Sequence, residues 1–396
     1  MVSKARKIKV ALLAAALAIA GSGLTNPASA DVQLNAAQIV SDMGAGWNLG
    51  NQMEANSNGV PNETAWGQPV ITQALVDKVK AAGFKTIRIP VSYLNKIGPG
   101  PNYTIDAAWL NRIQQVVNYA YNRGLHVLIN MHGDGYKSIN GAWLICDAGN
   151  QAAIKDKYQK VWQQVATKFQ SYNDHLIFES MNENFDGQYG RPTQPCYSNI
   201  NAYNQIFVDT VRRTGGNNAS RWLLVPGWNT NIDYTTGNYG FVLPTDRYRS
   251  PSIPGNEQRL MISVHYYDPW DFAGEESTKI TQWGRGSTNP AKKSTWGQED
   301  FLDAQMKKVY DKFVTKGYPA VVGEYGAVDK AFADSSNPRY RADYVRAVAA
   351  TAKKYGAAPV YWDNGYNGQY GFGLFNRASV TVTQQGMINA ILSGVG

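Results

Sequence analysis

The chain has 396 residues, of which 43% are hydrophobic and 17% are charged. Its 38 glycines, 17 prolines and 2 cysteines exclude a collagen-like chain, a wholly disordered chain and a disulfide-rich miniprotein. Aromatic residues are abundant, with 11 Trp, 24 Tyr and 12 Phe. At ordinary hydrophobicity, this abundance favours a surface that stacks on flat, hydroxyl-rich ligands.

Residues 1–30 have the pattern of a secretory signal peptide. Four basic residues lie between positions 4 and 9, an apolar run follows over 10–20, and Pro-Ala-Ser-Ala ends the segment at Ala30. The apolar run is too short to cross a bilayer as a helix, so we expect a secreted, extracellular protein without a membrane anchor. Removal of this segment lowers the formal charge from +8 to +4. No Lys/Arg cluster remains in 31–396, which excludes nucleic acid as a partner.

The rest of the chain alternates between short apolar runs and longer amphipathic segments, without a linker or a repeat. The runs that predict strands are 46–49, 86–91, 126–131, 176–181, 222–226, 260–266, 320–323 and 359–362. The segments that predict helices are 72–82, 106–123, 151–170, 199–214, 299–316, 339–355 and 383–392. Most of these helices end at a glycine, which is typical of a helix C-terminus.

Eight strand–helix units predict an α/β fold, a single (β/α)8 TIM barrel over 31–396. An open, doubly wound sheet is the alternative. Neither a G-x-G-x-x-G sequence after the first strand nor a P-loop occurs, so we expect no nucleotide cofactor.

Polar residues interrupt or follow the apolar runs at one end. They are Arg88, His132, Asn182, Glu183, His265, Tyr267, Glu324 and Trp362. Each alone has an ordinary structural explanation, such as a helix cap or a solvated loop residue. Because an active site forms at the carboxyl ends of barrel strands, the whole set predicts one there.

Two carboxylates on one face, Glu183 and Glu324, favour glycoside hydrolysis. One carboxyl protonates the leaving oxygen, and the other attacks the anomeric carbon or activates water. Strands four and seven face each other across a narrow barrel, which favours a separation of about 5 Å and retention of configuration.

The set resembles glycoside hydrolase family 5, the former cellulase family A. The resemblance runs from GWNLGN (46–51) to GFGLFNR (371–377), with the Asn-Glu pair, the His-x-Tyr, the second Glu and the late Trp in the family's order. The tail YWDNG (361–365) with GFGLFNR is most similar to the endoglucanase and xyloglucanase branch. It implies a retaining endo-β-1,4-glucanase acting on β-glucan, with xyloglucanase, lichenase and endo-mannanase as alternatives.

The resemblance also implies residue roles. Glu183 would be the acid/base and Glu324 the nucleophile, held ionised by Arg88 and bonded by Tyr267. We expect the pKa of Glu183 to be raised by the facing carboxylate. Asn182 would bind the sugar 2-hydroxyl, His132 and His265 would line the same subsite, and Trp362 would lie beneath the sugar.

Loop residues are expected to contact the substrate away from the cleavage point. Trp228 and Trp270 fall at a strand end and in a long loop, where a tryptophan is costly to expose, so we expect them to line a glycan cleft. Asn51, Glu54 and Asn364 are candidates for hydrogen bonds to neighbouring hydroxyls.

Two other classes of protein remain as alternatives. A metal-dependent hydrolase would use His132, Glu183, His265 and Glu324 as ligands, but Arg88 would repel a cation there, so we expect no metal. A non-catalytic glycan-binding barrel would explain loop aromatics but not the paired glutamates. We expect a monomer.

The two cysteines, Cys146 and Cys196, are predicted to form a disulfide. They fall in the loops after strands three and four, which a barrel places side by side, and a secreted protein tends to avoid free thiols.

Overall fold

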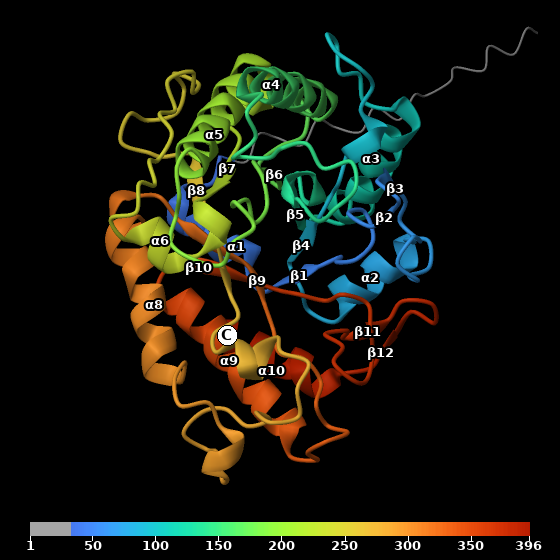
Figure 1. Ribbon diagram of the computed structural model, residues 1–396, viewed down its shortest axis with the longest axis vertical. Helices are drawn as coiled ribbons and strands as arrows, with labels where there is room; N and C mark the ends of the chain where they lie inside the picture. Colours follow the sequence, from blue (N-terminus) through green and yellow to red (C-terminus); the bar gives the residue numbers. More distant parts are fainter. Residues whose placement is uncertain (1–32) are drawn as a thin grey trace, which may run out of the picture. The chain divides into compact units, whose positions relative to one another are not determined.

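A closed ring of eight parallel strands forms the centre of the computed structural model, which describes residues 33–396 (Figure 1). In ring order the strands are β1 (Gly46–Asn48), β10 (Ala357–Tyr361), β9 (Ala320–Tyr325), β8 (Leu260–Tyr266), β7 (Leu223–Pro226), β6 (Leu176–Glu179), β5 (His126–Ile129) and β4 (Thr86–Ile89). Gly46 pairs with both Val360 and Thr86, so the first strand closes the ring with the last. The predicted TIM barrel is confirmed. The predicted signal peptide, 1–30, lies outside the described residues.

Helices surround this ring in Figure 1. They are α2 (Gln73–Ala81), α3 (Ala107–Tyr121), α4 (Gln151–Lys168), α5 (Cys196–Arg213), α6 (Ile232–Thr236), α8 (Glu299–Lys312), α9 (Asn337–Lys354) and α10 (Gln385–Val395). The helix between β7 and β8 is the short α6, and α7 (Trp270–Ala273) lies in the long loop after β8. Two hairpins, β2 (Asn56–Ser57) with β3 (Val60–Pro61) and β11 (Phe375–Asn376) with β12 (Thr381–Val382), decorate the barrel. Within 33–396, no helix is long and apolar enough to span a membrane.

Alternation along each strand divides the core into two layers. On β5, Val127 and Ile129 belong to the large apolar layer that also contains the buried residues of the surrounding helices. The intervening Leu128 belongs to a second cluster, together with Ile177 and Met261 of neighbouring strands. Since successive side chains of a strand point to opposite faces, this second cluster is the inside of the barrel.

The amino end of the barrel is covered by α1 (Ala36–Met43), a helix that the apolar runs did not predict. Its Ile39 and Met43 are fully buried in the inner cluster. A capping box fixes the start of the helix, because Asn35 accepts from Gln38 N–H and the Gln38 side chain accepts from Asn35 N–H. The inner cluster therefore has an apolar lid at this end.

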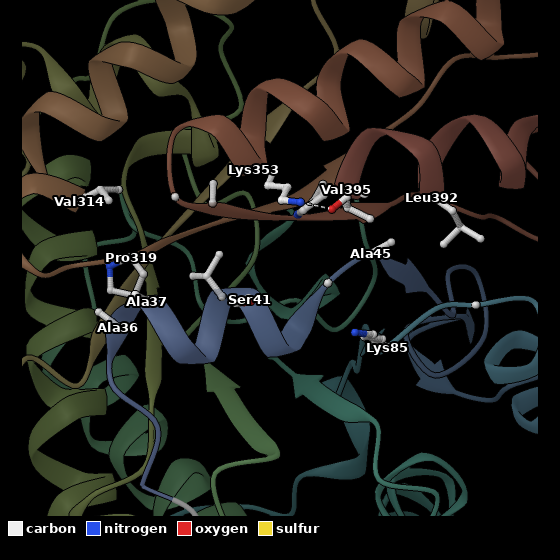
Figure 2. A pocket seen from close by; sticks show the side chains of 17 residues that line it. Ala36, Ala37, Ser41, Ala45, Lys85, Val314, Pro319, Lys353, Leu392 and Val395 are labelled. Carbon is white, nitrogen blue, oxygen red and sulfur yellow. Dashed lines mark hydrogen bonds between the residues drawn. The ribbon is translucent and has the colours of Figure 1, made fainter.

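A cavity of about 660 Å³ lies at the same end, between α1 and the C-terminal helix α10 (Figure 2). Ala37, Leu392 and Val395 are among its mostly apolar lining, and Lys353 donates a hydrogen bond to the backbone oxygen of Val395. Among the described residues that line this cavity, none has an imidazole or a carboxylic acid side chain. The polar residues predicted at the strand ends lie instead at the opposite end of the barrel.

Candidate active site

The eight polar residues predicted at strand ends lie at the carboxyl end of the barrel, linked through mutual contacts. Three stand within strands, Arg88 on β4, His265 on β8 and Glu324 on β9. The others, His132, Asn182, Glu183, Tyr267 and Trp362, follow the ends of their strands directly or within a few residues. The sequence therefore predicted the place where these side chains gather.

The two glutamates lie close together but have different hydrogen-bond partners. Glu183 accepts from Tyr136 Oη at 2.7 Å, and its other oxygen lies 2.7 Å from His265 Nδ1. Glu324 accepts from Arg88 Nη1 at 2.9 Å and from Tyr267 Oη at 3.1 Å. One oxygen of each glutamate and a nitrogen of His265 all lie within 4.8 Å of one another. This short separation fits the retaining geometry, in which one carboxylate attacks the sugar directly.

Arg88 is the centre of a fully buried polar network. Its Nε donates to Glu179 at 2.7 Å, and its Nη1 donates to Asn48 at 3.0 Å besides Glu324. Its Nη2 donates to Asn182 at 2.8 Å. The guanidinium is therefore shared between two carboxylates and two side-chain amides, whereas the sequence suggested a single partner.

Asn182 connects this network to Glu183. Its amide nitrogen donates to Tyr136 Oη at 2.9 Å and lies 3.2 Å from Nε2 of His132. Tyr136 in turn donates to Glu183. The orientation of Asn182 is thus fixed from both sides, by Arg88 on its oxygen and by Tyr136 on its nitrogen.

The pKa directions of the two glutamates are opposite to the division expected from the sequence. Burial raises the pKa of Glu324, and the charge of Glu183 raises it further against the opposing effects of His265 and Arg88. Burial also acts to raise the pKa of Glu183, but hydrogen bonds from His265 and Tyr136 outweigh it, so that this pKa is lowered. The sequence did not show that Arg88 is shared with Glu179 or that His265 donates to Glu183.

The pKa of His265 is shifted in the opposite direction to that of Glu183. Burial lowers the pKa of His265, but the nearby charges of Glu324 and Glu183 and the hydrogen bond to Glu183 outweigh it, so that the pKa is raised. This raised pKa favours the protonated form of His265, whose Nδ1 lies one hydrogen bond away from Glu183.

Trp362 presents a partly exposed ring beside these groups. The ring lies parallel to His132, with an interplanar angle of 5° and centroids 6.2 Å apart. The chain also requires a glycine next to this ring, because a Cβ on Gly50 would come within 2.8 Å of Cη2 of Trp362 and 2.6 Å of the Asp363 carbonyl oxygen. The first and last strand-end loops therefore set the position of this ring together.

Asn51, Glu54 and Asn364 serve mainly their own loops. Buried Glu54 accepts from the backbone N–H groups of Asn51 and Gln52, and burial raises its pKa to about 7. The side-chain oxygen of Asn364 accepts from two backbone N–H groups, 3.1 Å away in each case. The side chains of Glu54 and Asn364 thus hold their own loops, and hydrogen bonds from Asn51, Glu54 or Asn364 to sugar hydroxyls stay a prediction.

The two predicted loop tryptophans differ. Trp228 is only 3% exposed and packs edge-on against Phe185, which leaves little of its ring for contact with a glycan. Apolar burial against the neighbouring loop accounts for its position. Trp270 on α7 is 55% exposed and stands at right angles to Tyr267, with ring centroids 6.2 Å apart. Of the two tryptophans, Trp270 is therefore the one with an exposed surface beside Tyr267.

The predicted disulfide is present between Cys146 and Cys196, whose Cα atoms are 4.5 Å apart. Cys146 lies in the loop after β5, and Cys196 begins α5 after the loop that follows β6. The bond therefore joins the loops that follow His132 and Glu183.

The cluster of Glu183, His265 and Glu324 has the donor atoms that a divalent cation would need. A positive group already occupies it, because Arg88 donates to Glu324 at 2.9 Å. His132 lies outside this cluster, so the four ligands that the metal-dependent alternative requires do not converge. The arrangement fits two carboxyl groups acting on an acetal better than it fits a metal centre.

Three residues of the site were missed in the sequence. Glu179 and Asn48 stand inside apolar runs, where a charged or amide side chain was itself a signal of an inward-facing polar position. Tyr136 follows His132 by four residues, and only the folding of the loop brings its hydroxyl to Glu183.

Comparison with known proteins places this geometry in a family. Residues 50–368 match the family model described as cellulase, glycosyl hydrolase family 5. The chain is 67% identical over 387 residues to Endoglucanase A of Paenibacillus barcinonensis, covering 98% of this chain and 97% of that protein.

Solved structures agree with this match. A family 5 xyloglucanase from Paenibacillus pabuli, solved with a ligand, superposes with a TM-score of 0.89 at 71% identity, covering 91% of this chain and 100% of that one. A GH5-4 broad specificity endoglucanase from Bacteroides salanitronis gives a TM-score of 0.84 at 40% identity, covering 91% and 95%. Sequence, fold and the paired glutamates thus lead to one conclusion: the chain belongs to glycosyl hydrolase family 5, in its endoglucanase and xyloglucanase branch.

Proposed function

We propose that the protein is a secreted, monomeric endo-β-1,4-glucanase that cleaves internal glucosidic bonds with retention of configuration. One observation carries the mechanism: Glu183 and Glu324 approach closely, and one is paired with a histidine while the other is paired with an arginine. Secretion rests on the pattern of residues 1–30 alone.

Glu324 is the proposed nucleophile. Arg88 and Tyr267 donate to its two oxygens, which fixes the carboxylate plane toward the site. The raised pKa of Glu324 means that its carboxylate is more basic than usual. A more basic carboxylate attacks an anomeric carbon more readily than a strongly ion-paired one. Attack forms a glycosyl ester and displaces the leaving oxygen.

Glu183 is the proposed acid and base. When substrate fills the cleft it excludes water, and desolvation favours the neutral forms of both Glu183 and His265. The proton then passes from His265 Nδ1 to Glu183 across their 2.7 Å hydrogen bond, and Glu183 delivers it to the leaving oxygen. Once Glu324 is esterified its charge is gone, and Glu183 as a carboxylate activates the water that releases the sugar.

The remaining contacts bind the sugar at the cleavage point. Asn182, held by Arg88 and Tyr136, is placed to bond the 2-hydroxyl, where an interaction strengthens in the transition state. His132 lines the same subsite, Trp362 provides the stacking face, and Trp270 is proposed as an outer contact.

Relatives differ in the substrate that their names state. One is named an endoglucanase and another, at 71% identity, is described as a xyloglucanase. We therefore propose unbranched β-1,4-glucan as the first substrate and xyloglucan as the second candidate. Mixed-linkage glucan and mannan are the other two polysaccharides to be tested.

The test is kcat/KM on these four polysaccharides, with viscosity and reducing ends measured together. A rapid fall in viscosity per new reducing end is expected for internal cleavage. Early products followed by proton NMR should be the β-anomer. First formation of the α-anomer would exclude retention, and failure to cleave any of the four would favour a non-catalytic glycan-binding barrel.

A further inference from the structure

Glu179 is a buried carboxylate that the mechanism above does not use. It is the last residue of β6 and is 0% exposed. One oxygen accepts from Arg88 Nε at 2.7 Å, and the other accepts from Ser263 Oγ on β8 at 2.6 Å. Both contacts lie inside the barrel, so Glu179 has no surface left for a substrate.

Its first effect is geometric. A guanidinium is planar, so a carboxylate that fixes the Nε edge also fixes the directions of the two Nη groups. In this site Nη1 points to Glu324 at 2.9 Å and Nη2 points to Asn182 at 2.8 Å. Glu179 is thus the anchor from which Arg88 orients both of these groups.

Its second effect is electrostatic. Arg88 is a single cation between two buried carboxylates, at 2.7 Å from Glu179 and 2.9 Å from Glu324. A cation that faced Glu324 alone would stabilise its charged form strongly and weaken its reactivity as a nucleophile. The negative charge of Glu179 offsets part of that stabilisation.

We propose that Glu179 is a positioning residue for the nucleophile, which fixes the plane of Arg88 and takes up part of its charge so that Glu324 keeps the basicity needed for attack. The inference rests on the proposed role of Glu324. The raised pKa of Glu324, caused first by burial and then by the charge of Glu183, agrees with an incomplete neutralisation by Arg88.

Glu179→Gln separates charge from geometry. The glutamine retains an oxygen for Arg88 Nε and an amide that can donate to Ser263, but it carries no charge. Ser263→Ala is the matched control, because it removes a hydrogen bond from the same carboxylate and leaves its charge in place.

The readout is the rate of inactivation by dinitrophenyl 2-deoxy-2-fluoro-β-cellobioside as a function of pH. Dinitrophenolate leaves without protonation, so the acid limb of this profile reports the ionisation of the nucleophile alone. In Glu179→Gln the limb is expected about one pH unit lower than in the wild type, since a neighbouring negative charge is lost. The plateau rate should fall several-fold. Ser263→Ala should keep the wild-type limb.

An unchanged limb in Glu179→Gln, or an equal shift in Ser263→Ala, would overturn the charge argument. Glu179→Asp tests the geometric argument even if the glutamine variant does not fold. It keeps the charge on a shorter side chain, so the limb should stay and the plateau should fall. An unchanged plateau would contradict positioning.

Peptide mapping of the inactivated enzyme separates the two proposals. A label on Glu324 with an unshifted limb in Glu179→Gln would contradict only the role of Glu179. A label on any other residue would contradict the proposed function itself.

Discussion

Each end of the barrel holds a cluster of carboxylate and histidine side chains, and the same strands connect the two. At the amino end Asp42, His126 and His175 have donor atoms within 4.8 Å of one another, as do Glu183, His265 and Glu324 at the carboxyl end. β5 begins at His126 and leads to His132, while His175 directly precedes β6, which leads to Glu183. Residue type and proximity therefore do not distinguish the two clusters.

Their surroundings do distinguish them. The Asp42 side chain is 51% exposed and accepts from buried His126 at 2.8 Å, while His175 stacks on His126 with ring centroids 4.4 Å apart. This cluster contains one carboxylate, which water screens. The other contains two carboxylates, of which Glu324 is buried and Glu183 is partly buried, and Arg88 fixes the orientation of Glu324. We infer that a second carboxylate and a fixed cation make the carboxyl-end cluster reactive, while the amino-end cluster ties α1 to the barrel.

The largest expected difference is in catalysis. Glu324→Gly should lower kcat/KM by on the order of 10⁴-fold or more, because the covalent step is lost. Azide should restore turnover of activated substrates and give the α-glycosyl azide. Asp42→Asn, the matched change at the amino end, should leave kcat/KM within about twofold. A comparable loss in Asp42→Asn would end the distinction between the clusters.

The disulfide should give the next largest effect, on stability. It closes a loop of 50 residues between Cys146 and Cys196. By the chain-entropy estimate this contributes roughly 4 kcal/mol to the free energy of unfolding, less any native strain. The double variant Cys146→Ser/Cys196→Ser should therefore show a lower urea midpoint. Two thiols titrated in the denatured, unreduced wild type would contradict the bond.

The amino-end cluster should make the stability of the protein depend on pH. Burial lowers the pKa of His126 to about 4, below the 6.5 of a free histidine side chain, although Asp42 acts to raise it. Between about pH 6.5 and pH 4, His126 is protonated in the unfolded chain but not in the folded chain. The free energy of unfolding therefore falls as the pH drops through this range. The loss is at most about 3 kcal/mol. Urea unfolding at pH 7.5 and 4.5 should show a smaller loss in His126→Gln, whereas an equal loss would assign the effect elsewhere.

Trp362→Ala should give the smallest effect of the series, about 1–3 kcal/mol in transition-state binding for a lost aromatic face. Because the ring lies beside His132 at the cleavage point, kcat should fall as well as affinity. Steady-state kinetics on a soluble glucan, with exposed Trp296→Ala as control, separate the two. An unchanged kcat would move Trp362 to an outer subsite.

The sequence predicted the barrel because its local signals recur along the chain: eight apolar runs alternate with seven amphipathic segments, most of which end at a glycine. It also predicted which polar side chains gather, since strand ends meet at one end whatever the packing. It did not predict α1, whose role as a lid depends on fitting the inner cluster. It gave the pKa directions of Glu183 and Glu324 wrongly, because these depend on which hydrogen bonds His265 and Glu179 make. The burial of Trp228 was likewise a matter of tertiary packing.

The contact between Gly50 and Trp362 makes activity depend on the whole chain. Gly50 follows the first strand of the ring and Trp362 follows the last, and Gly50 N–H donates to the backbone oxygen of Asp363 at 3.0 Å. A chain that stops before β10 would contain Glu183 and Glu324 but would have neither the Trp362 ring, proposed to stack on the sugar, nor a closed barrel. Hydrolysis thus reports that synthesis reached the eighth unit and that its strand docked beside the first, which makes catalytic activity an internal check on complete folding.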